Sequence, residues 1–402
     1  MKAKIRILFI CLFMFLVLMN CQREKSNESE WQGSLEEENG VQIVNNPEDP
    51  FYGNLELELE QDLIIGNEED DHYFFYRAHE VAVDSQENIY VMDAGNFRIQ
   101  KFSRSGEYLQ TIGEKGQGPG EFDHMYSFYI NQKGQIYVLG GTKIQKFNEK
   151  GEFEKSIPLA LRMYNFWVSP EDFIYGIVYT ATEEGRKRKI VKVNMEGKEV
   201  GDIAQFACID VVSRKSEGRT IAFSLTHSYN HSLCLTPAKF KNLIYGYSAD
   251  YRIFRVNSKG EIDLIINKKE PYHSISIKEK AAIVQEIEED ISNRNQKWPE
   301  DVIKEACQFP AHRPFFSDIA TDDKRRIYVR RVKSVLNEKE TQEFDIISAD
   351  GFYLYRTEID FMPCLINKGF IYRMKSDKET GSLKLIRYQI KNWDQIKTTL
   401  PK

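Results

Sequence analysis

The sequence lacks the residue patterns on which several familiar classes of site depend. Its six cysteines include no CxxC pair and no other metal-ligand spacing, so we predict neither a structural zinc nor any other cofactor. The glycine-rich run from Gly113 to Gly120 lacks the Gly-Lys-Ser/Thr ending of a phosphate-binding loop. We therefore interpret that run as a connecting loop.

An excess of positive charge is missing as well. Lys and Arg number 55 against 61 Asp and Glu, a net charge of −6. The first twenty residues carry three positive charges and no negative ones, so their removal would leave −9. Because nucleic acids favour a basic surface, we expect no nucleic-acid partner.

A repeated dipeptide is the main feature that is present. Ile-Tyr occurs six times within runs of alternating apolar and polar residues, at Ile89, Ile136, Ile174, Ile244, Ile327 and Ile371. The intervals between successive copies are 47, 38, 70, 83 and 44 residues, and the three short ones approach the roughly 40 to 50 residues of a four-stranded propeller blade. The sequence predicts an all-β fold, a six-bladed β-propeller of four-stranded antiparallel blades.

The first copy shows the unit most clearly. Four alternating runs begin at Val81, Ile89, Arg98 and Tyr108 and are separated by turn residues. The third and fourth runs are joined by a polar turn that ends in glycine, and this turn recurs in five copies, at Gly106, Gly151, Gly197, Gly260 and Gly351. A tight hairpin usually requires positive φ, which glycine adopts readily.

The sixth copy is one strand short. After Phe370–Arg373 and Leu383–Ile390 the chain has no glycine turn and no fourth run. An alternating run from Leu55 to Glu60, continuing to Ile65, is left over upstream of the first blade. We predict that this N-terminal strand completes blade six, because closing the ring hides two sheet edges.

Two segments exceed a minimal blade. Between Cys208 and Leu233 the extra residues of blade four could add strands or a long loop, and the sequence leaves both open. From Ser276 to Cys307 the apolar period changes to three and four residues, with Ser276 and Glu279 as a capping box. We predict a helical insertion over residues 274–308 on one face of the disk between blades four and five. It would either cover apolar surface or serve as a lid or partner-docking element.

The N-terminus carries export signals. A positive start precedes the apolar run Ile7 to Met19, whose 13 residues are too few to span a bilayer. The end of this run, Leu18 to Cys21, resembles a bacterial lipobox, which implies a signal peptide over residues 1–20 and acylation of Cys21. The alternative is a cleaved soluble secretory protein. Residues 21–50 are polar and predict a flexible tether, followed by the propeller over residues 51–402.

The first blade also carries a family resemblance. The run Val81–Phe102 resembles an NHL-type repeat, while Gly113–Phe122 and Pro314–Asp318 are similar to motifs of the six-bladed propeller lipoproteins of Bacteroidetes. The resemblance implies the fold and a lipid-anchored place in the cell envelope, at the outer membrane or the periplasmic face. It leaves the activity open.

Propeller lyases and lactonases related to NHL repeats provide an enzymatic hypothesis. In the lyase pattern a histidine precedes the innermost strand of several blades. Aligning the copies on Ile-Tyr places His79 opposite Tyr126, Tyr164, Cys234, Ser317 and Phe361, and one histidine cannot assemble a three-histidine zinc site. His227 and His231 are weak candidates as ligands. Asp84, Asn131 and Asp322, which share a repeat position, are expected to bond the following turn, and Asp93, Asn96 and Arg98 to stabilise their blade.

The function that the sequence favours is a binding or assembly module for a protein, glycan or peptide, with a membrane protein as a further candidate partner. His79, Tyr126 and Tyr164 are the predicted ligand-binding residues at the channel mouth, where rings could stack on a ligand; packing against the next blade is their alternative role. The competing hypotheses are a metal-dependent lyase or lactonase and a ligand sensor coupled to nutrient uptake. We predict four separate buried thiols at Cys208, Cys234, Cys307 and Cys364. For the basic cluster Lys324–Arg326 with Arg330 and Arg331 we predict a solvated blade edge.

Overall fold

The computed structural model describes residues 30–182, 185–208, 212–216, 219–223, 225, 227–238, 242–294, 298–337, 341–377 and 380–401. By its internal contacts the chain divides before Gly33, and residues 33–402 group into one compact unit. Cys21 and the signal peptide expected over residues 1–20 lie outside the described residues.

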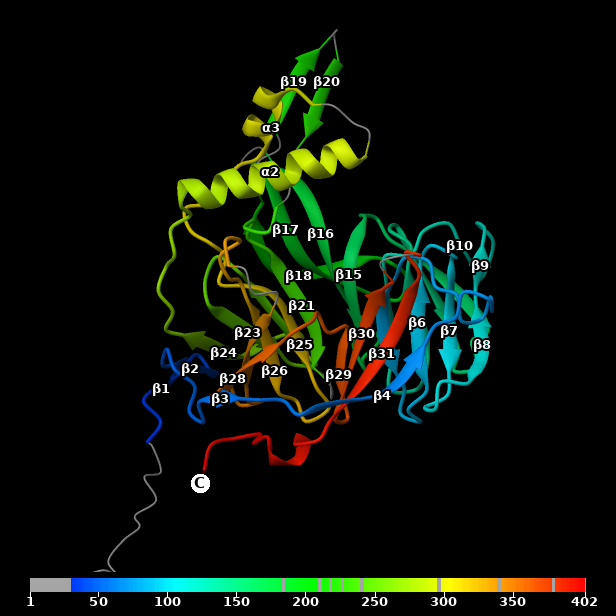
Figure 1. Ribbon diagram of the computed structural model, residues 1–402, viewed down its shortest axis with the longest axis horizontal. Coiled ribbons are helices and arrows are strands. Elements are labelled where there is room, and N and C mark those ends of the chain that lie inside the picture. Colours follow the sequence, from blue (N-terminus) through cyan, green and yellow to red (C-terminus); the bar gives the residue numbers. More distant parts are fainter. Residues whose placement is uncertain are drawn as a thin grey trace, which may run out of the picture. The chain divides into compact units, whose positions relative to one another are not determined.

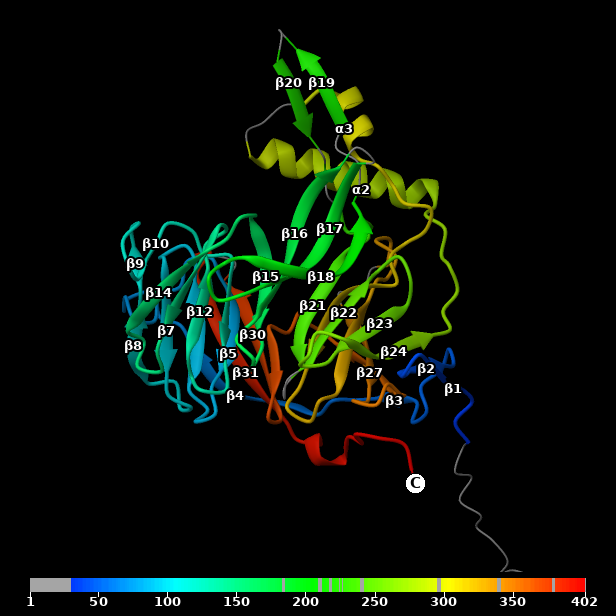
Figure 2. The same ribbon diagram turned by 180° about the vertical axis from the view of Figure 1, so that it is seen from behind.

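Six antiparallel sheets form a six-bladed propeller, as predicted (Figures 1 and 2). The innermost strands contact one another in a closed circle. In blade order they are β5 (Ala78–Val83), β11 (Ser127–Ile130), β15 (Met163–Val168), β21 (Leu233–Ala238), β25 (Phe316–Thr321) and β29 (Leu365–Asn367). The second strands, which carry the Ile-Tyr pairs, are β6 (Ile89–Asp93), β12 (Ile136–Leu139), β16 (Ile174–Thr182), β22 (Asn242–Tyr247), β26 (Ile327–Arg331) and β30 (Phe370–Ser376).

The outer strands complete the blades. The third strands are β7 (Arg98–Phe102), β13 (Lys143–Phe147), β17 (Gly185–Val193), β23 (Arg252–Val256), β27 (Gln342–Ile347) and β31 (Leu383–Ile390). The fourth strands are β8 (Tyr108–Ile112), β14 (Phe153–Pro158), β18 (Glu199–Ala207), β24 (Ile262–Lys268), β28 (Tyr353–Ile359) and, in blade six, β4 (Leu59–Ile65). The four runs predicted for the first copy are therefore the four strands of blade one.

The Ile-Tyr pairs form the packing surfaces between blades. Both side chains are buried in all six copies, and none is more than 3% exposed. Alternation along a strand sends the Ile and the Tyr to opposite faces of their blade, so each pair contributes to the interfaces with both neighbouring blades. The recurrence of this dipeptide is thus explained by packing.

The glycine turns behave as predicted. Gly106, Gly151, Gly197, Gly260 and Gly351 all have positive φ, between 79° and 92°. At Gly197 a β-carbon would also lie 1.7 Å from the carbonyl oxygen of Pro158. Both the backbone conformation and the close approach of blade two therefore require glycine there.

The N-terminal segment closes the ring and does more than was predicted. β4 pairs antiparallel with β31 and supplies the missing strand of blade six. The upstream part of the predicted run, β3 (Asn54–Leu55), pairs instead with β28 of blade five. Further upstream, β1 (Ser34–Glu38) and β2 (Val41–Asn46) form a hairpin, and β2 pairs parallel with β24 of blade four.

The predicted flexible tether is therefore wrong for residues 34–46. The segment is polar, but its Ile43 and Val44 add to the outer edge of blade four, beside Ile265 and Ile266 of β24. Strand addition satisfies the backbone of an edge that the repeats alone leave open. Residues 41–65 thus join the outer strands of blades four, five and six in turn.

The two insertions lie between blades three and five. Residues 208–233 include a hairpin of β19 (Val212–Ser216) and β20 (Arg219–Phe223). The helical insertion consists of α2 (Ile277–Asn293) and α3 (Glu300–Ala306), as predicted. Both views show α2 and α3 together beyond the same ends of the blades (Figures 1 and 2).

Three short elements remain. The glycine-rich run connects blades one and two through β9 (Glu114–Lys115) and β10 (Glu121–Phe122), which pair parallel, so its assignment as a connecting loop is confirmed. A 3₁₀ turn, η1 (Trp393–Gln395), follows the last strand. No helix in the part of the chain described is long and apolar enough to cross a membrane.

Candidate functional site

The three residues predicted at the channel mouth lie at or next to the innermost strands of blades one to three. The ring Nδ1 of His79 lies 3.0 Å from the carbonyl oxygen of Arg77. Tyr126 stacks against His124, and the Tyr164 ring meets Tyr179 edge-on at 4.8 Å. Each ring is thus engaged by a neighbour from its own blade, and the predicted role in ligand binding stays a prediction.

Strand pairing corrects the alignment behind these residues. The residues opposite the six tyrosines on the innermost strands are Ala82, Tyr129, Trp167, Leu235, Ala320 and Leu365. In blade one, His79 lies three positions before Ala82. The residues three positions before the other five are Tyr126, Tyr164, Ser232, Ser317 and Met362. The corrected alignment therefore has Ser232 in place of Cys234 and Met362 in place of Phe361. The spacing from innermost to second strand differs in blades four and six, which a fixed offset from Ile-Tyr could not reveal.

The repeated acidic position stabilises turns, as predicted. Asp84 Oδ1 accepts hydrogen bonds from the backbone of Gln86 and Asn88, each at 2.9 Å. Asn131 and Asp322 bond the turns that follow them in the same way. Asp93 accepts from Tyr76 N, Asn96 and Arg98, which confirms its role within the blade.

The histidine pair is held by backbone carbonyls. His227 Nε2 lies 2.9 Å from Gln308 O, and His231 Nε2 lies 3.3 Å from His312 O. Among the described residues no group of three His, Cys, Asp or Glu side chains could hold a metal ion. The four described cysteines are separate thiols, as predicted, but the predicted burial is wrong for Cys208 and Cys364, which are half-buried.

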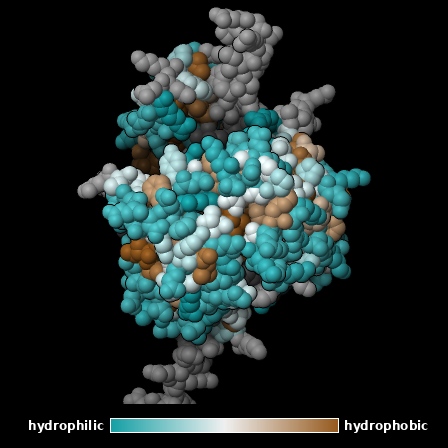
Figure 3. Space-filling model, turned by 90° about the vertical axis from the view of Figure 1, so that its right-hand side faces the viewer, coloured by the Kyte–Doolittle hydropathy of each residue, from teal (hydrophilic) through white to brown (hydrophobic). Residues whose placement is uncertain are grey.

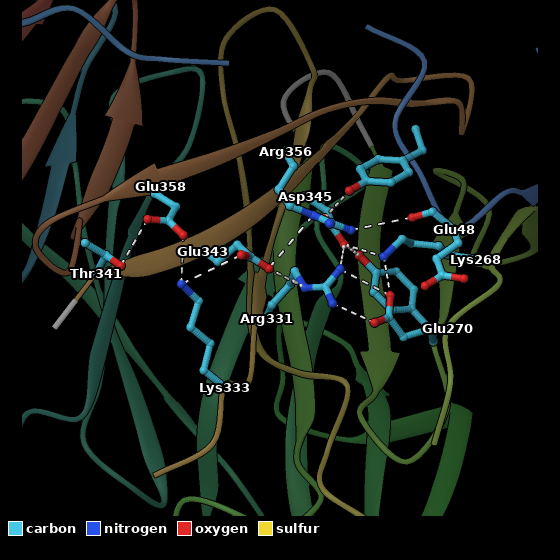
Figure 4. A network of polar contacts seen from close by, with 12 residues as sticks. Glu48, Lys268, Glu270, Arg331, Lys333, Thr341, Glu343, Asp345, Arg356 and Glu358 are labelled. Atoms are coloured by element: carbon cyan, nitrogen blue, oxygen red, sulfur yellow. Dashed lines mark hydrogen bonds and ion pairs between the residues drawn. The ribbon is translucent and has the colours of Figure 1, made fainter. Parts of the chain in front are cut away.

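A charged network joins blades four and five, and Figure 4 shows its side chains converging on Asp345. The Asp345 carboxylate is fully buried and lies 3.0 Å from Lys268 Nζ and 3.3 Å from Arg356 Nε. It also accepts hydrogen bonds from the hydroxyls of Tyr251, at 2.6 Å, and Tyr353. The network therefore ties the outer strands of two blades through one buried acid.

Arg331 extends this network towards the surface. Its guanidinium binds both carboxylate oxygens of Glu270, at 2.6 and 3.2 Å, and Glu343 at 2.7 Å. Beyond it, Lys333 lies 3.0 Å from Glu358 and 3.7 Å from Glu343. The positive and negative charges of this region are interleaved, so most of them have a partner of opposite sign.

The surrounding charges keep Asp345 and Arg331 ionised. Burial acts to raise the pKa of Asp345, but Lys268, Arg331 and the tyrosine hydroxyls outweigh it and lower that pKa. Burial likewise opposes the charge of Arg331, yet the carboxylates of Asp345, Glu270 and Glu343 raise its pKa. Removing one member would leave the others as uncompensated buried charges.

Two cavities adjoin this network and share Glu270 and Phe315 as walls. The larger, about 660 Å³, also has polar and charged walls from blade five and from the segments that flank the helical insertion. The smaller, about 220 Å³, is bounded by Tyr251, Tyr272 and Lys268, among others. We call the two cavities together the interblade groove.

Aromatic rings border the interblade groove on one side. Tyr272 is 65% exposed, and its ring lies 5.3 Å from that of Phe315 and 4.6 Å from that of His312. Leu336, on the larger cavity, is 47% exposed. Exposed rings beside charged groups are typical of sites for polar ligands.

The helical insertion is fixed over this region by Glu279. Its side chain closes the predicted capping box with Ser276, which is thereby confirmed. The same carboxylate accepts hydrogen bonds from Tyr229 of the segment before β21 and Ser334 of the loop after β26, each at 2.7 Å. Ile283, Cys307 and Val335 pack around this contact. The insertion is thus attached to blades four and five, as predicted.

Sequence reasoning missed most of these residues. The basic cluster was the available signal, but its assignment to a solvated edge is wrong for Arg326 and Arg331. The Arg326 side chain is fully buried, with Nε 2.6 Å from Asp322 and its guanidinium 4.0 Å from the Trp393 ring. Asp322 is only four positions from Arg326, but Trp393 and, for Arg331, Glu270 are distant in sequence. Strand patterning alone does not place these distant partners beside the arginines.

A family model described as a 6-bladed beta-propeller (DUF5128) matches residues 68–260, just under half of the chain. This match and the blade count confirm the predicted resemblance to six-bladed propellers. No curated protein matches the chain.

Three solved structures are similar to most of the chain. A protein from Bacteroides fragilis NCTC 9343, described as exported, is 15% identical with a TM-score of 0.52, over 87% of this chain and 99% of that one. A DUF4221 family member from Bacteroides vulgatus is 11% identical, with a TM-score of 0.48 over 83% and 98%. Virginiamycin B lyase from Staphylococcus aureus is 11% identical, with a TM-score of 0.39 over 82% and 99%. At 15% identity the likeness to the first of these concerns the fold alone, and we take no activity from any of the three.

Proposed function

We propose that this chain is a lipid-anchored propeller of the cell envelope that works as a binding module, with the interblade groove as its site for a glycan or peptide ligand. The observation that carries the proposal is the larger cavity, of about 660 Å³, in which rings and charged side chains converge beside the helical insertion. A cavity of this size is in the range of small-ligand sites. The export signals and Cys21 support the envelope location.

The side of the molecule drawn in Figure 3 is mostly hydrophilic, which favours a polar ligand over a broad apolar contact. On the side drawn in Figure 3, the coloured atoms form small separate apolar patches among hydrophilic ones. Large apolar faces usually mark stable protein interfaces. The groove differs by combining exposed Tyr272 and Leu336 with paired charges in one place.

Site-specific photo-crosslinking in cells would test the proposal. A photoreactive residue replaces Leu336 at the groove, and a matched variant carries it at Leu109 of blade one, because these leucines are 47% and 48% exposed. We expect a discrete adduct at position 336 that is absent at 109. The Cys21→Ala form should lose both the membrane fraction and the adduct. Equal labelling at both positions would contradict the groove as the binding site.

A further inference from the structure

We propose that the ligand of the interblade groove is a saccharide that carries a carboxylate, and that Arg313 binds this carboxylate. The inference rests on the proposed function and specifies its ligand class. It starts from an imbalance among the charged side chains of the larger cavity, whose walls include Arg313, Arg331 and Lys333 but only two carboxylates, Glu270 and Glu343.

The two carboxylates are already engaged by the other cations. Glu270 holds Arg331 through both of its oxygens, and Glu343 contacts Arg331 at 2.7 Å and Lys333 at 3.7 Å. Lys333 also has Glu358 at 3.0 Å. Of the cations on this cavity, Arg313 is therefore the one for which the described residues provide no carboxylate within hydrogen-bond distance.

The hydrogen bonding of Arg313 is incomplete among the described residues. Its Nε is buried and has no hydrogen-bond partner among the described residues. The nearest ion-pair partner, Glu279 Oε1, is 3.8 Å away and already accepts from Tyr229 and Ser334. The side chain is 18% exposed and lies on the cavity wall. Because Nε itself is buried, a ligand carboxylate would bind the part of the guanidinium that faces the cavity and would add charge-assisted hydrogen bonds there.

The backbone near Arg313 favours a saccharide over an extended peptide. A peptide usually binds through free main-chain groups at a strand edge or loop. Here the N–H groups of Arg313, Phe315 and Val332 already donate to His273 O, Ser248 O and Phe315 O. Polar ligand groups would thus meet side chains, and the carboxylates and Asn337 suit hydroxyls. The Tyr272 and Phe315 rings offer flat apolar faces for the C–H side of a sugar ring.

Titration calorimetry with three probes tests the inference: a hexuronic acid oligosaccharide, its carboxyl-reduced neutral counterpart, and a glutamate-rich peptide. The proteins are the mature chain, Arg313→Gln, Arg313→Lys and Arg255→Gln. Arg255 is a matched control because its side chain is 21% exposed and pairs with Asp263 in blade four.

We expect the acidic oligosaccharide to bind at least about tenfold more tightly than the neutral one, as one charge-assisted contact allows. Arg313→Gln should remove this preference without weakening the neutral probe. Arg313→Lys should restore part of it, and Arg255→Gln should leave it unchanged. Unchanged melting temperatures would show that all variants fold.

Three results would overturn the inference. Equal affinity for the acidic and neutral probes would exclude recognition of a carboxylate, while the groove would stand if Phe315→Ala weakened both. Tighter binding of the peptide would exclude the saccharide class. No binding of any probe would also reject the inference, whereas the proposed function would still be decided by crosslinking at position 336.

Discussion

The junction between blades one and two differs from the junction between blades four and five. The first is mainly apolar, with Met92, Phe122 and Phe128 packed together, and one carboxylate, Glu80, accepts from Phe128 N across it. The second contains the buried Lys268–Asp345 pair and the added strand β2. The repeat alone suffices to join two blades, so the polar second junction points to a requirement beyond closing the ring.

The largest expected difference between the two junctions is in the loss of unfolding free energy when one buried carboxylate at each is changed to an amide. Asp345→Asn removes the negative charge that offsets Lys268 and Arg331, so we expect a loss of about 3–5 kcal/mol in the free energy of unfolding. Glu80→Gln keeps an acceptor for Phe128 N. Burial raises the pKa of Glu80, so loss of its charge should cost less than about 1 kcal/mol. Urea denaturation measures both, and similar losses would contradict the comparison.

The next largest loss of stability is expected in β2, the N-terminal strand added to blade four. Asn46 is 4% exposed and donates to Gly351 O at 2.7 Å while accepting from Tyr353 N at 2.8 Å. Asn46→Ala leaves these backbone groups without their partner, and we expect a loss of about 1–3 kcal/mol in unfolding free energy.

The adjacent Asn45 is the control, because its hydrogen bonds to Ser34, Glu36 and Asn267 all join side chains, so its loss leaves no backbone group without a partner. Asn45→Ala should change stability by less than about 0.5 kcal/mol. If the two variants were equally stable, the strand would not be a working part of blade four, and the predicted tether would regain support.

Separation along the chain explains which of these features could be predicted. The blade strands, the glycine turns and the capping box at Ser276 depend on residues a few positions apart. By contrast, Asn46 and Gly351 are 305 positions apart, and Lys268 and Asp345 are 77 apart. The polar composition of residues 34–46 led to the prediction of a flexible tether. The segment instead forms strands, because β2 is stabilised by pairing with β24, which is distant in sequence.

The groove was beyond prediction for a related reason. Arg313, Tyr272 and Phe315 lie on segments next to the helical insertion, whose own position was predicted. Their convergence requires the path of those segments over blades four and five. The repeat alignment directed attention to His79, Tyr126 and Tyr164, because only repeated positions can be compared within one sequence.

The attachment of the helical insertion should depend on pH. Hydrogen bonds from Ser276, Ser334 and Tyr229 outweigh burial and lower the pKa of Glu279 from 4.5 to about 2. A lowered folded-state pKa gives stability that is complete above the unfolded value and is lost as pH falls. The protection factors of the α2 amides, which correct for the pH dependence of intrinsic exchange, should thus be constant from pH 7 to about 5 and fall between about 5 and 2.

Glu279→Gln is the matched variant. It should expose α2 to faster exchange at neutral pH, with a loss of about 1–2 kcal/mol for the attachment, and its protection should no longer fall with acid. Exchange in blade one serves as the internal reference. A variant that retained the acid dependence of the mature chain would show that another group controls it.

The smallest expected effect lies within the repeat itself, at the tyrosines of Ile-Tyr. Tyr90 donates its hydroxyl to Asp84 at 3.1 Å, whereas the buried Tyr137 hydroxyl has no hydrogen-bond partner among the described residues, since Asn131 stands at the position of Asp84. Tyr90→Phe should therefore cost about 0.5–1.5 kcal/mol, while Tyr137→Phe should be neutral or slightly stabilising. Chemical denaturation of both variants gives the comparison. A cost for Tyr137→Phe equal to that for Tyr90→Phe would mean that an ordered water accepts the hydrogen bond of the Tyr137 hydroxyl in place of the missing carboxylate. The tyrosine hydroxyls of blades one and two would then be equally well hydrogen-bonded.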